Sequence, residues 1–106
     1  MIYSWSHTFV NTQVILTHLK ENISEIRRCF SVEKLSIFGS FARGEGTTQS
    51  DLDVLVTFEQ KATFDLFMDL KFYLEDLLGI KVDLVTDKAL RPQVRRAIEG
   101  EIVDVT

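Results

Sequence analysis

The sequence predicts a single α+β domain in which a small mixed β-sheet is flanked by helices. Short apolar runs, typical of buried strands, alternate with longer segments whose apolar residues recur every three to four positions, as in amphipathic helices. The chain has 106 residues, 45% of them hydrophobic and 26% charged, which suits one globular core. No repeat or linker divides it, so we expect residues 1–106 to form one domain, with residues 1–10 as a flexible tail.

The first expected element is an amphipathic helix over residues 14–30, where apolar residues follow helical spacing. Asn11 or Thr12 is suited to cap its start, because both side chains can accept a hydrogen bond from a free amide of the first turn. A short apolar run over residues 35–38 then predicts a buried strand, which ends at Gly39.

A second strand is expected over residues 51–58, followed by a helix over residues 63–79. Thr63 provides a capping side chain at the start of this helix, and Gly79 suits its C-terminal end. Residues 80–86 have the apolar character of a third strand.

The last helix is expected to begin at Pro92 and to run to about Ile98, because proline suits the first turn of a helix. Gly100 is expected to end helical structure there. Residues 101–106 then form a short edge strand. The order of helices and strands predicts a small sheet with helices packed against it.

Bulk composition narrows the class of function. The net charge of -4 argues against direct binding to long nucleic acids, which depends on lysine and arginine neutralising phosphates. No apolar stretch approaches the roughly 18 residues of a membrane span, and the N-terminus lacks the pattern of a signal peptide. We therefore expect a cytoplasmic protein that does not insert into membranes.

The segment GSFARGEGTTQSDLDVLV, residues 39–56, is unusual for a connection between two strands. Such connections commonly need about two to six residues, and carboxylates are costly at the start of a buried strand. Alternation along a strand places Asp51 and Asp53 on one face, with α-carbons about 6 to 7 Å apart. Two like charges this close both stay ionised only if a cation lies between them.

A third carboxylate, Asp83, stands within the apolar run of the third expected strand. If the second and third strands are neighbours, Asp83 converges on Asp51 and Asp53. Oxygen ligands at this density suit Mg²⁺ or Mn²⁺, hard ions that complete their coordination with water and substrate phosphates. The sequence therefore predicts a metal site formed by three aspartates.

Gly39, Ser40 and Arg43 are the candidate phosphate-binding residues. Gly39 allows a tight turn at the strand end. If residues 40–44 form a helical turn, its amides and the Ser40 hydroxyl can bind a phosphate, and Arg43 supplies positive charge. Phosphate donors facing metal-binding carboxylates indicate a nucleotidyl-transfer site.

This pattern resembles the minimal nucleotidyltransferases of the DNA polymerase beta-like superfamily. Their signature is Gly-Ser, ten residues, Asp-x-Asp, and a third Asp on a later strand. The positions that match it are Gly39, Ser40, Asp51, Asp53 and Asp83. The ten-residue gap and the ARGE sequence after Gly-Ser add specificity, and the resemblance covers about residues 14–98.

The resemblance implies a polymerase beta palm-like fold and transfer of AMP from ATP, with release of pyrophosphate, on a site with two Mg²⁺ ions. Asp51 and Asp53 would hold both ions, and Asp83 would complete the one that activates the attacking hydroxyl. Members this short are similar to antitoxins encoded beside a HEPN-type ribonuclease toxin. The implied acceptor is a toxin tyrosine, and the implied assembly is a hetero-oligomer.

Two other functions compete with protein adenylylation. The chain could neutralise its toxin by occlusion, retaining the site only for nucleotide binding. Alternatively, it could transfer a nucleotide to a small molecule, with a homodimer interface completing the acceptor site. The helix over residues 63–79 carries apolar residues around most of its circumference, and one small domain cannot easily bury all of them. We therefore expect part of this helix to meet a partner or a second copy.

Overall fold

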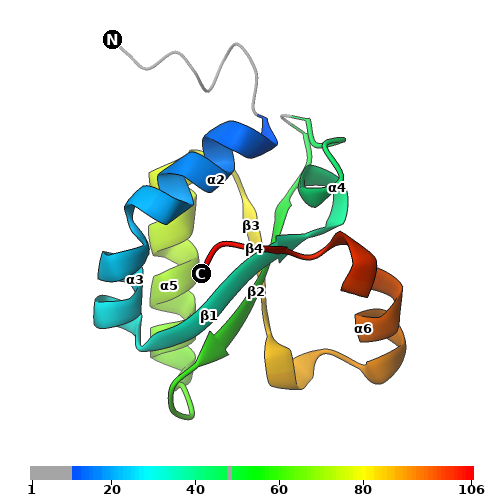
Figure 1. The fold of residues 1–106 in the computed structure, drawn as a ribbon. Helices are drawn as coiled ribbons and strands as arrows, with labels where there is room; N and C mark the ends of the chain where they lie inside the picture. Colours follow the sequence, from blue (N-terminus) through cyan, green and yellow to red (C-terminus); the bar gives the residue numbers. More distant parts are fainter. Residues whose placement is uncertain (1–10, 48) are drawn as a thin grey trace, which may run out of the picture.

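The computed structural model of the chain describes residues 11–106 except residue 48. The expected tail, residues 1–10, lies outside the described residues. The fold is a four-stranded mixed sheet with strand order β3-β2-β1-β4, covered by α2, α3 and α5 on one side and by α6 on the other (Figure 1). The expected α+β class is confirmed.

The helices and strands follow the expected order along the chain. Their bounds are α2 (Thr12–Glu21), α3 (Ile23–Phe30), β1 (Val32–Phe38), α4 (Gly39–Ala42), β2 (Leu52–Phe58), α5 (Phe64–Leu78), β3 (Val82–Thr86), the 3-10 helix η1 (Asp87–Ala89), α6 (Pro92–Ile98), the 3-10 helix η2 (Glu99–Glu101) and β4 (Val103–Asp104).

The strand pairing brings the start of β3 beside the start of β2. β2 lies between β1, to which it is antiparallel, and β3, to which it is parallel. β4 pairs antiparallel with the last part of β1, where Ile37 lies opposite Val103. The expected C-terminal edge strand is therefore present, and it brings the end of the chain back to the strand that precedes Gly39.

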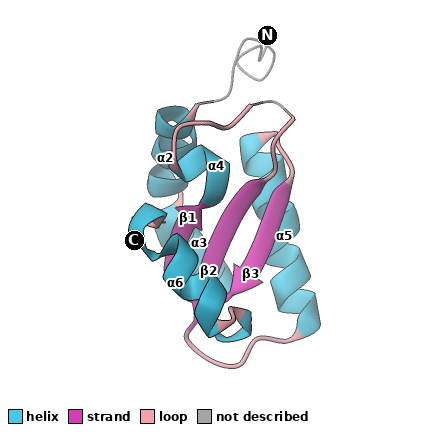
Figure 2. Ribbon diagram, turned by 90° about the vertical axis from the view of Figure 1, so that its right-hand side faces the viewer, coloured by secondary structure: helices cyan, strands magenta, loops and turns pink. Residues whose placement is uncertain are grey.

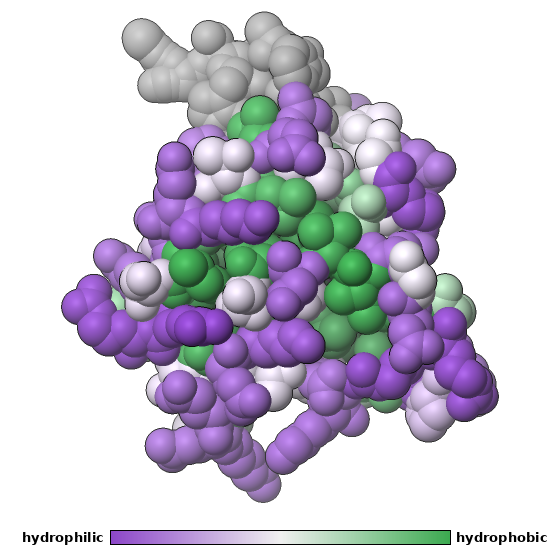
Figure 3. Space-filling model, in the orientation of Figure 1, coloured by the Kyte–Doolittle hydropathy of each residue, from purple (hydrophilic) through white to green (hydrophobic). Residues whose placement is uncertain are grey.

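The core lies between the sheet and the helices α2, α3 and α5. Leu70, Leu74 and Leu78 of α5 are fully buried, because residues four apart share one face of a helix. Alternate residues of β2, such as Val54 and Val56, face them from the sheet. Figure 3 shows apolar side chains reaching the surface in the middle of the face seen in Figure 1, with polar side chains around them.

The first helix is divided, so the expectation of one helix over 14–30 is wrong. α2 ends at Glu21 and α3 begins at Ile23, with Asn22 between them. The side-chain amide of Asn22 donates to the His18 carbonyl at 2.8 Å. Asparagine side chains compete in this way with helical backbone hydrogen bonds, which favours a break.

The caps of the helices also position the site. The Asn11 side chain accepts from the Val14 amide at 2.9 Å, so Asn11 caps α2. Thr12 has another role, because its hydroxyl donates to the Phe41 carbonyl and joins α2 to α4. The expected cap of α5 is confirmed, since the Thr63 hydroxyl accepts from the Leu66 amide at 3.1 Å.

The ends of α5 and α6 mostly follow the sequence pattern. α5 ends at Leu78 and is capped by Gly79, whose left-handed backbone has φ of 70°, and α6 begins at Pro92. Gly100 does not stop helical structure as expected, because η2 continues through it to Glu101. Within the part of the chain that the structure describes, no helix has the length and apolar character needed to span a bilayer.

Candidate active site

The Gly-Ser sequence forms a short helical turn, α4, directly after β1, as expected. Gly39 has φ of 77°, and a Cβ atom added to it would lie 2.1 Å from Oδ2 of Asp53. Both the backbone conformation and the close approach therefore require glycine. Figure 2 shows α4 in front of the sheet, near the ends at which β2 and β3 begin.

The carboxylates of Asp53 and Asp83 come together across two parallel strands. Their residues are directly opposite in the register of β2 and β3. Both lie on the face of the sheet away from the α5 core, because their strand neighbours Leu52 and Val82 are buried. Asp51 immediately precedes β2 and is exposed.

The electrostatic state of Asp53 reflects this crowding. Partial burial, followed by the negative charges of Asp83 and Asp51, raises the pKa of Asp53 to about 6. Burial and nearby like charge both disfavour the ionised form of a carboxyl group. The charge of Asp51 thus acts on Asp53, although Asp51 lies outside the strand. Without a cation, the ionised trio is an unfavourable arrangement.

The described residues do not form a closed metal cage, since no three acidic, His or Cys side chains among them are gathered closely enough to enclose an ion. The three aspartates offer oxygen ligands alone, which suits a hard ion such as Mg²⁺. Mg²⁺ is commonly held by one or two carboxylates, with water and substrate phosphates completing its coordination. The donor set of Asp51, Asp53 and Asp83 consists of hard oxygen ligands, as such an ion requires.

Arg43, at the C-terminal end of α4, is held by two carboxylates. Its Nε donates to Oε1 of Glu45 at 3.1 Å, and its Nη1 donates to Oε1 of Glu101 at 3.0 Å. These hydrogen bonds to Glu45 and Glu101 raise the pKa of Arg43, so the guanidinium stays charged. An arginine has donors on three nitrogens, and Nη2 makes no hydrogen bond to any residue that the structure describes.

Glu101 belongs to this site but was not predicted from the sequence. Its Oε2 accepts the Gly39 backbone N–H at 2.8 Å. That hydrogen bond, followed by the one from Arg43, lowers the pKa of Glu101. No local pattern around Glu101 indicated this role, because the contact spans 62 residues of the chain.

A Gly-Ser turn that faces paired aspartates agrees with the family to which the sequence is similar. Residues 18–105 match the nucleotidyltransferase domain family. The chain belongs to this family. The protein is accordingly an enzyme of the nucleotidyltransferase class.

Two more comparisons support the nucleotidyltransferase assignment. The protein is 39% identical over 98 residues to the protein adenylyltransferase MntA of Thermococcus cleftensis, covering 92% of this chain and 96% of the relative. A solved structure of a proposed minimal nucleotidyltransferase is 34% identical and superposes with a TM-score of 0.75, covering 89% of this chain and 95% of that one.

A more distant solved structure shares the fold. It is the MNT antitoxin complex of Shewanella oneidensis with its tri-AMPylated HEPN toxin, at 16% identity and a TM-score of 0.62. That match covers 90% of this chain and 71% of the other. The nucleotidyltransferase fold is therefore retained across a wide range of sequence.

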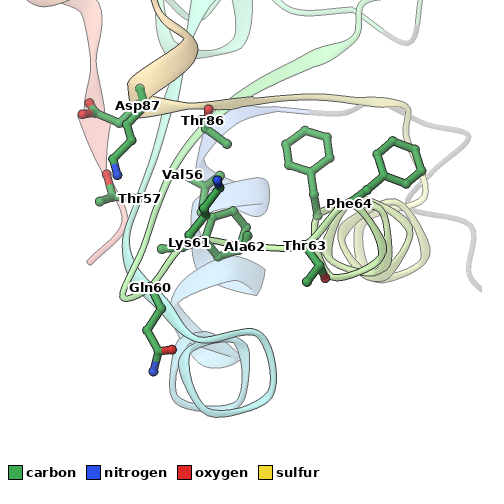
Figure 4. Close-up of a pocket in the computed structure, with 12 residues that line it drawn as sticks. Val56, Thr57, Gln60, Lys61, Ala62, Thr63, Phe64, Thr86 and Asp87 are labelled. Atoms are coloured by element: carbon green, nitrogen blue, oxygen red, sulfur yellow. The ribbon is translucent and has the colours of Figure 1, made fainter.

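The nucleotidyltransferase also has a pocket of about 330 Å³ that lies away from the carboxylates. Figure 4 shows Thr63 and Phe64, the cap and first residue of α5, on one side and Thr86 and Asp87, where β3 ends and η1 begins, on the other. Asp53 is near the start of β2, whereas this pocket is lined by residues at the end of β2. The pocket is thus separate from the candidate active site.

Proposed function

We propose that this nucleotidyltransferase transfers AMP from ATP to a hydroxyl group of a partner protein, releases pyrophosphate, and acts as an antitoxin. The name of the Thermococcus cleftensis relative, a protein adenylyltransferase, supports the reaction. The Shewanella oneidensis complex supports the class of partner, because its HEPN toxin is tri-AMPylated and bound to an MNT antitoxin. The proposed acceptor is a tyrosine of a cognate HEPN-type ribonuclease toxin.

The observation that carries this proposal is the pairing of Asp53 with Asp83 beside the Gly39 turn. Two carboxylates that share a face need a cation to stay ionised. A helical turn directly beside them offers amides and a hydroxyl to an anion. A ligand with both phosphates and bound cations satisfies the two requirements together, and a nucleoside triphosphate with magnesium is such a ligand.

The metal-binding residues in this proposal are Asp51, Asp53 and Asp83. Two Mg²⁺ ions, or Mn²⁺ in their place, would lower the pKa of the attacking hydroxyl and neutralise charge on the transferred phosphate. Asp51 and Asp53 would contribute to both ions, and Asp83 to one. Asp83 or a metal-bound water would help remove the proton of the acceptor hydroxyl.

The phosphate-binding residues in this proposal are Gly39, Ser40 and Arg43. The Ser40 hydroxyl makes no hydrogen bond to any described residue, which leaves it able to donate to a phosphate oxygen. Arg43 retains its Nη2 donors for the same purpose. Gly39 contributes by lacking a side chain, which lets the turn approach Asp53.

The partner surface that we propose lies on α5. Phe64 and Phe72 are 76% and 52% exposed, the two most exposed large apolar side chains among the described residues. They lie two helical turns apart, with the half-buried Met68 between them, so the three form one apolar stripe. An exposed apolar stripe on a small domain supports an interaction site at this position.

The acidic charge beside this stripe favours one kind of occupant. The exposed residues Asp65, Asp69 and Asp76 follow α5 in a row along one side of the stripe, and Lys71 also borders it, with Nζ 5.6 Å from the centroid of the Phe72 ring. A complementary partner therefore presents apolar side chains next to lysine or arginine. A second copy is a poorer occupant, because an antiparallel two-fold pairing of α5 would bring both acidic rows to the same side. We assign the stripe to the toxin rather than to a homodimer.

The decisive experiment is intact-mass spectrometry of the toxin candidate that is encoded beside this protein. The toxin candidate is first incubated with this protein, ATP and Mg²⁺. The native chain should add one or more AMP groups, and an Asp51→Ala, Asp53→Ala variant should add none. A matched control, Glu33→Ala with Glu59→Ala, removes two exposed carboxylates outside the site and should behave like the native chain. Toxin that stays inhibited but unmodified would indicate occlusion instead.

A further inference from the structure

Glu101 reaches the candidate active site from the opposite end of the chain. It is the last residue of η2 and lies two residues before β4. β4 pairs with β1, and the Val105 amide donates to the Leu35 carbonyl at 2.9 Å. Because Gly39 directly follows β1, this pairing places Glu101 next to the turn.

The Glu101 carboxylate spans both ends of α4. One oxygen accepts the backbone N–H of Gly39, the first residue of the turn, at 2.8 Å. The other accepts from Nη1 of Arg43, the residue that caps the turn, at 3.0 Å. Hydrogen bonds to a carboxylate are short and strong when the donor is charged. A single side chain therefore fixes the start and the end of α4.

The second partner of Arg43 is a weaker constraint. The Glu45 side chain is 65% exposed, against 19% for Glu101, and exposed ion pairs restrain little. Glu101 is thus the main group that orients the guanidinium. Arg43 uses the N–H of Nε and one N–H of Nη1 in these two bonds, which leaves the second N–H of Nη1 and both of Nη2.

We infer that Glu101 is a positioning residue for the nucleotide: it fixes the Gly39–Arg43 turn so that the Ser40 hydroxyl and Nη2 of Arg43 meet the triphosphate. This inference rests on the proposed function for its ligand. Glu101 itself stays bound to the turn while the nucleotide is present. If the Glu101 carboxylate instead occupied the position of a phosphate, nucleotide binding would have to displace it.

The first test is made without nucleotide. Amide exchange of Gly39 and the Nε resonance of Arg43 are measured by NMR in the native chain and in Glu101→Gln, Glu101→Ala and Glu99→Gln. Glu99 lies in the same 3-10 helix and is exposed, so Glu99→Gln is the matched control. Hydrogen exchange of the Gly39 amide should be faster in Glu101→Ala than in the native chain or in any of the other variants. Unchanged exchange and an unchanged Arg43 signal would overturn the proposed restraint of the turn.

The second test measures the Kd of AMP-PNP with Mg²⁺ by calorimetry, at a temperature where every variant is folded. Glu101→Gln should weaken binding by about fivefold and Glu101→Ala by about tenfold or more, with Glu99→Gln within about twofold. A purely structural role would lower the folded fraction but leave Kd unchanged. Affinity that stays equal or improves would overturn the inference and identify Glu101 as a competitor of phosphate.

A double-mutant cycle with Arg43→Gln tests whether Glu101 acts on nucleotide binding through Arg43. If Glu101 acts through Arg43, Glu101→Gln should cost little further affinity in the Arg43→Gln background. Fully additive losses would contradict this route. If nucleotide binding depends on Glu101 but no AMP is transferred to a protein, the proposed function alone is refuted. If the native chain binds no nucleotide, the proposed function and the inference on Glu101 are both refuted.

Discussion

Asp53 and Asp83 lie directly opposite each other on neighbouring parallel strands, on the face of the sheet away from the core. Gly39 packs against the same Asp53 carboxylate, where a Cβ would come within 2.1 Å of Oδ2. The candidate metal ligands and the candidate phosphate-binding turn therefore share one side chain. A change at either of them is expected to affect both.

Removing the charge of Asp53 should stabilise the metal-free protein while abolishing AMP transfer. The pKa of Asp53 is raised to about 6, so at pH 7.5 folding holds an ionised group in an unfavourable site. Asp53→Asn should raise the free energy of unfolding by about 1 kcal/mol in EDTA, a value discounted for partial exposure. Urea denaturation at pH 7.5 measures this difference.

The sign of this effect depends on pH. Between an unfolded pKa of about 4 and the folded value of about 6, the folded state binds more protons than the unfolded state. The contribution of Asp53 to stability therefore falls as the pH rises through this window. The advantage of Asp53→Asn should vanish near pH 4, and an advantage that persists there would show that it has another cause.

Binding of Mg²⁺ should release a proton near pH 6. At this pH the Asp53 carboxyl is partly protonated, and a metal ligand must be ionised. The observed enthalpy of binding should therefore depend on the ionisation enthalpy of the buffer at pH 6 and much less at pH 8. Calorimetry of Mg²⁺ with the protein alone, in two buffers, measures this without the proton that a nucleotide phosphate would release. Asp53→Glu retains a carboxylate and serves as a comparison. A binding enthalpy that does not depend on the buffer at pH 6 would contradict the assignment of Asp53 as a metal ligand.

Gly39→Ala should inactivate the enzyme and destabilise the fold by about 2 to 4 kcal/mol, because it adds both backbone strain and a steric clash with Asp53. Gly44→Ala is the matched control. Gly44 has the same φ of 77°, but no atom lies within 4 Å of the added Cβ. The difference between the two variants in AMP transfer and in unfolding therefore isolates the clash. Equal losses would mean that backbone strain alone matters.

Substituting the apolar stripe should weaken toxin binding without affecting nucleotide binding. A Phe64→Ser, Phe72→Ser variant should lower affinity for the toxin by at least about tenfold, as expected for aromatic residues at an interface. Val94, which is 41% exposed on α6, provides the control Val94→Ser. The measurement is calorimetry with the toxin, together with light scattering of the protein alone. Unchanged toxin affinity would place the interface elsewhere, and a native dimer lost in the variant would assign the stripe to a second copy.

Local patterns in the sequence determined much of the fold. Gly39, Thr63, Gly79 and Pro92 mark element ends because each depends on the conformation or hydrogen bonding of its own neighbourhood. The period of two in β2 likewise placed Asp53 opposite the buried face. The break at Asn22 was missed, because an apolar pattern that continues through residues 14–30 does not reveal the side-chain hydrogen bond to His18.

Which carboxylates meet depends on strand pairing between distant parts of the chain. The Gly-Ser turn and the Asp-x-Asp strand follow from the sequence alone, because their spacing is local. That Asp83 lies opposite Asp53 follows from the parallel pairing of β2 and β3. That Glu101 reaches Gly39 follows from the pairing of β4 with β1. Both contacts join residues far apart in the chain, and such pairing is decided by the packing of the whole sheet and its helices rather than by any local pattern.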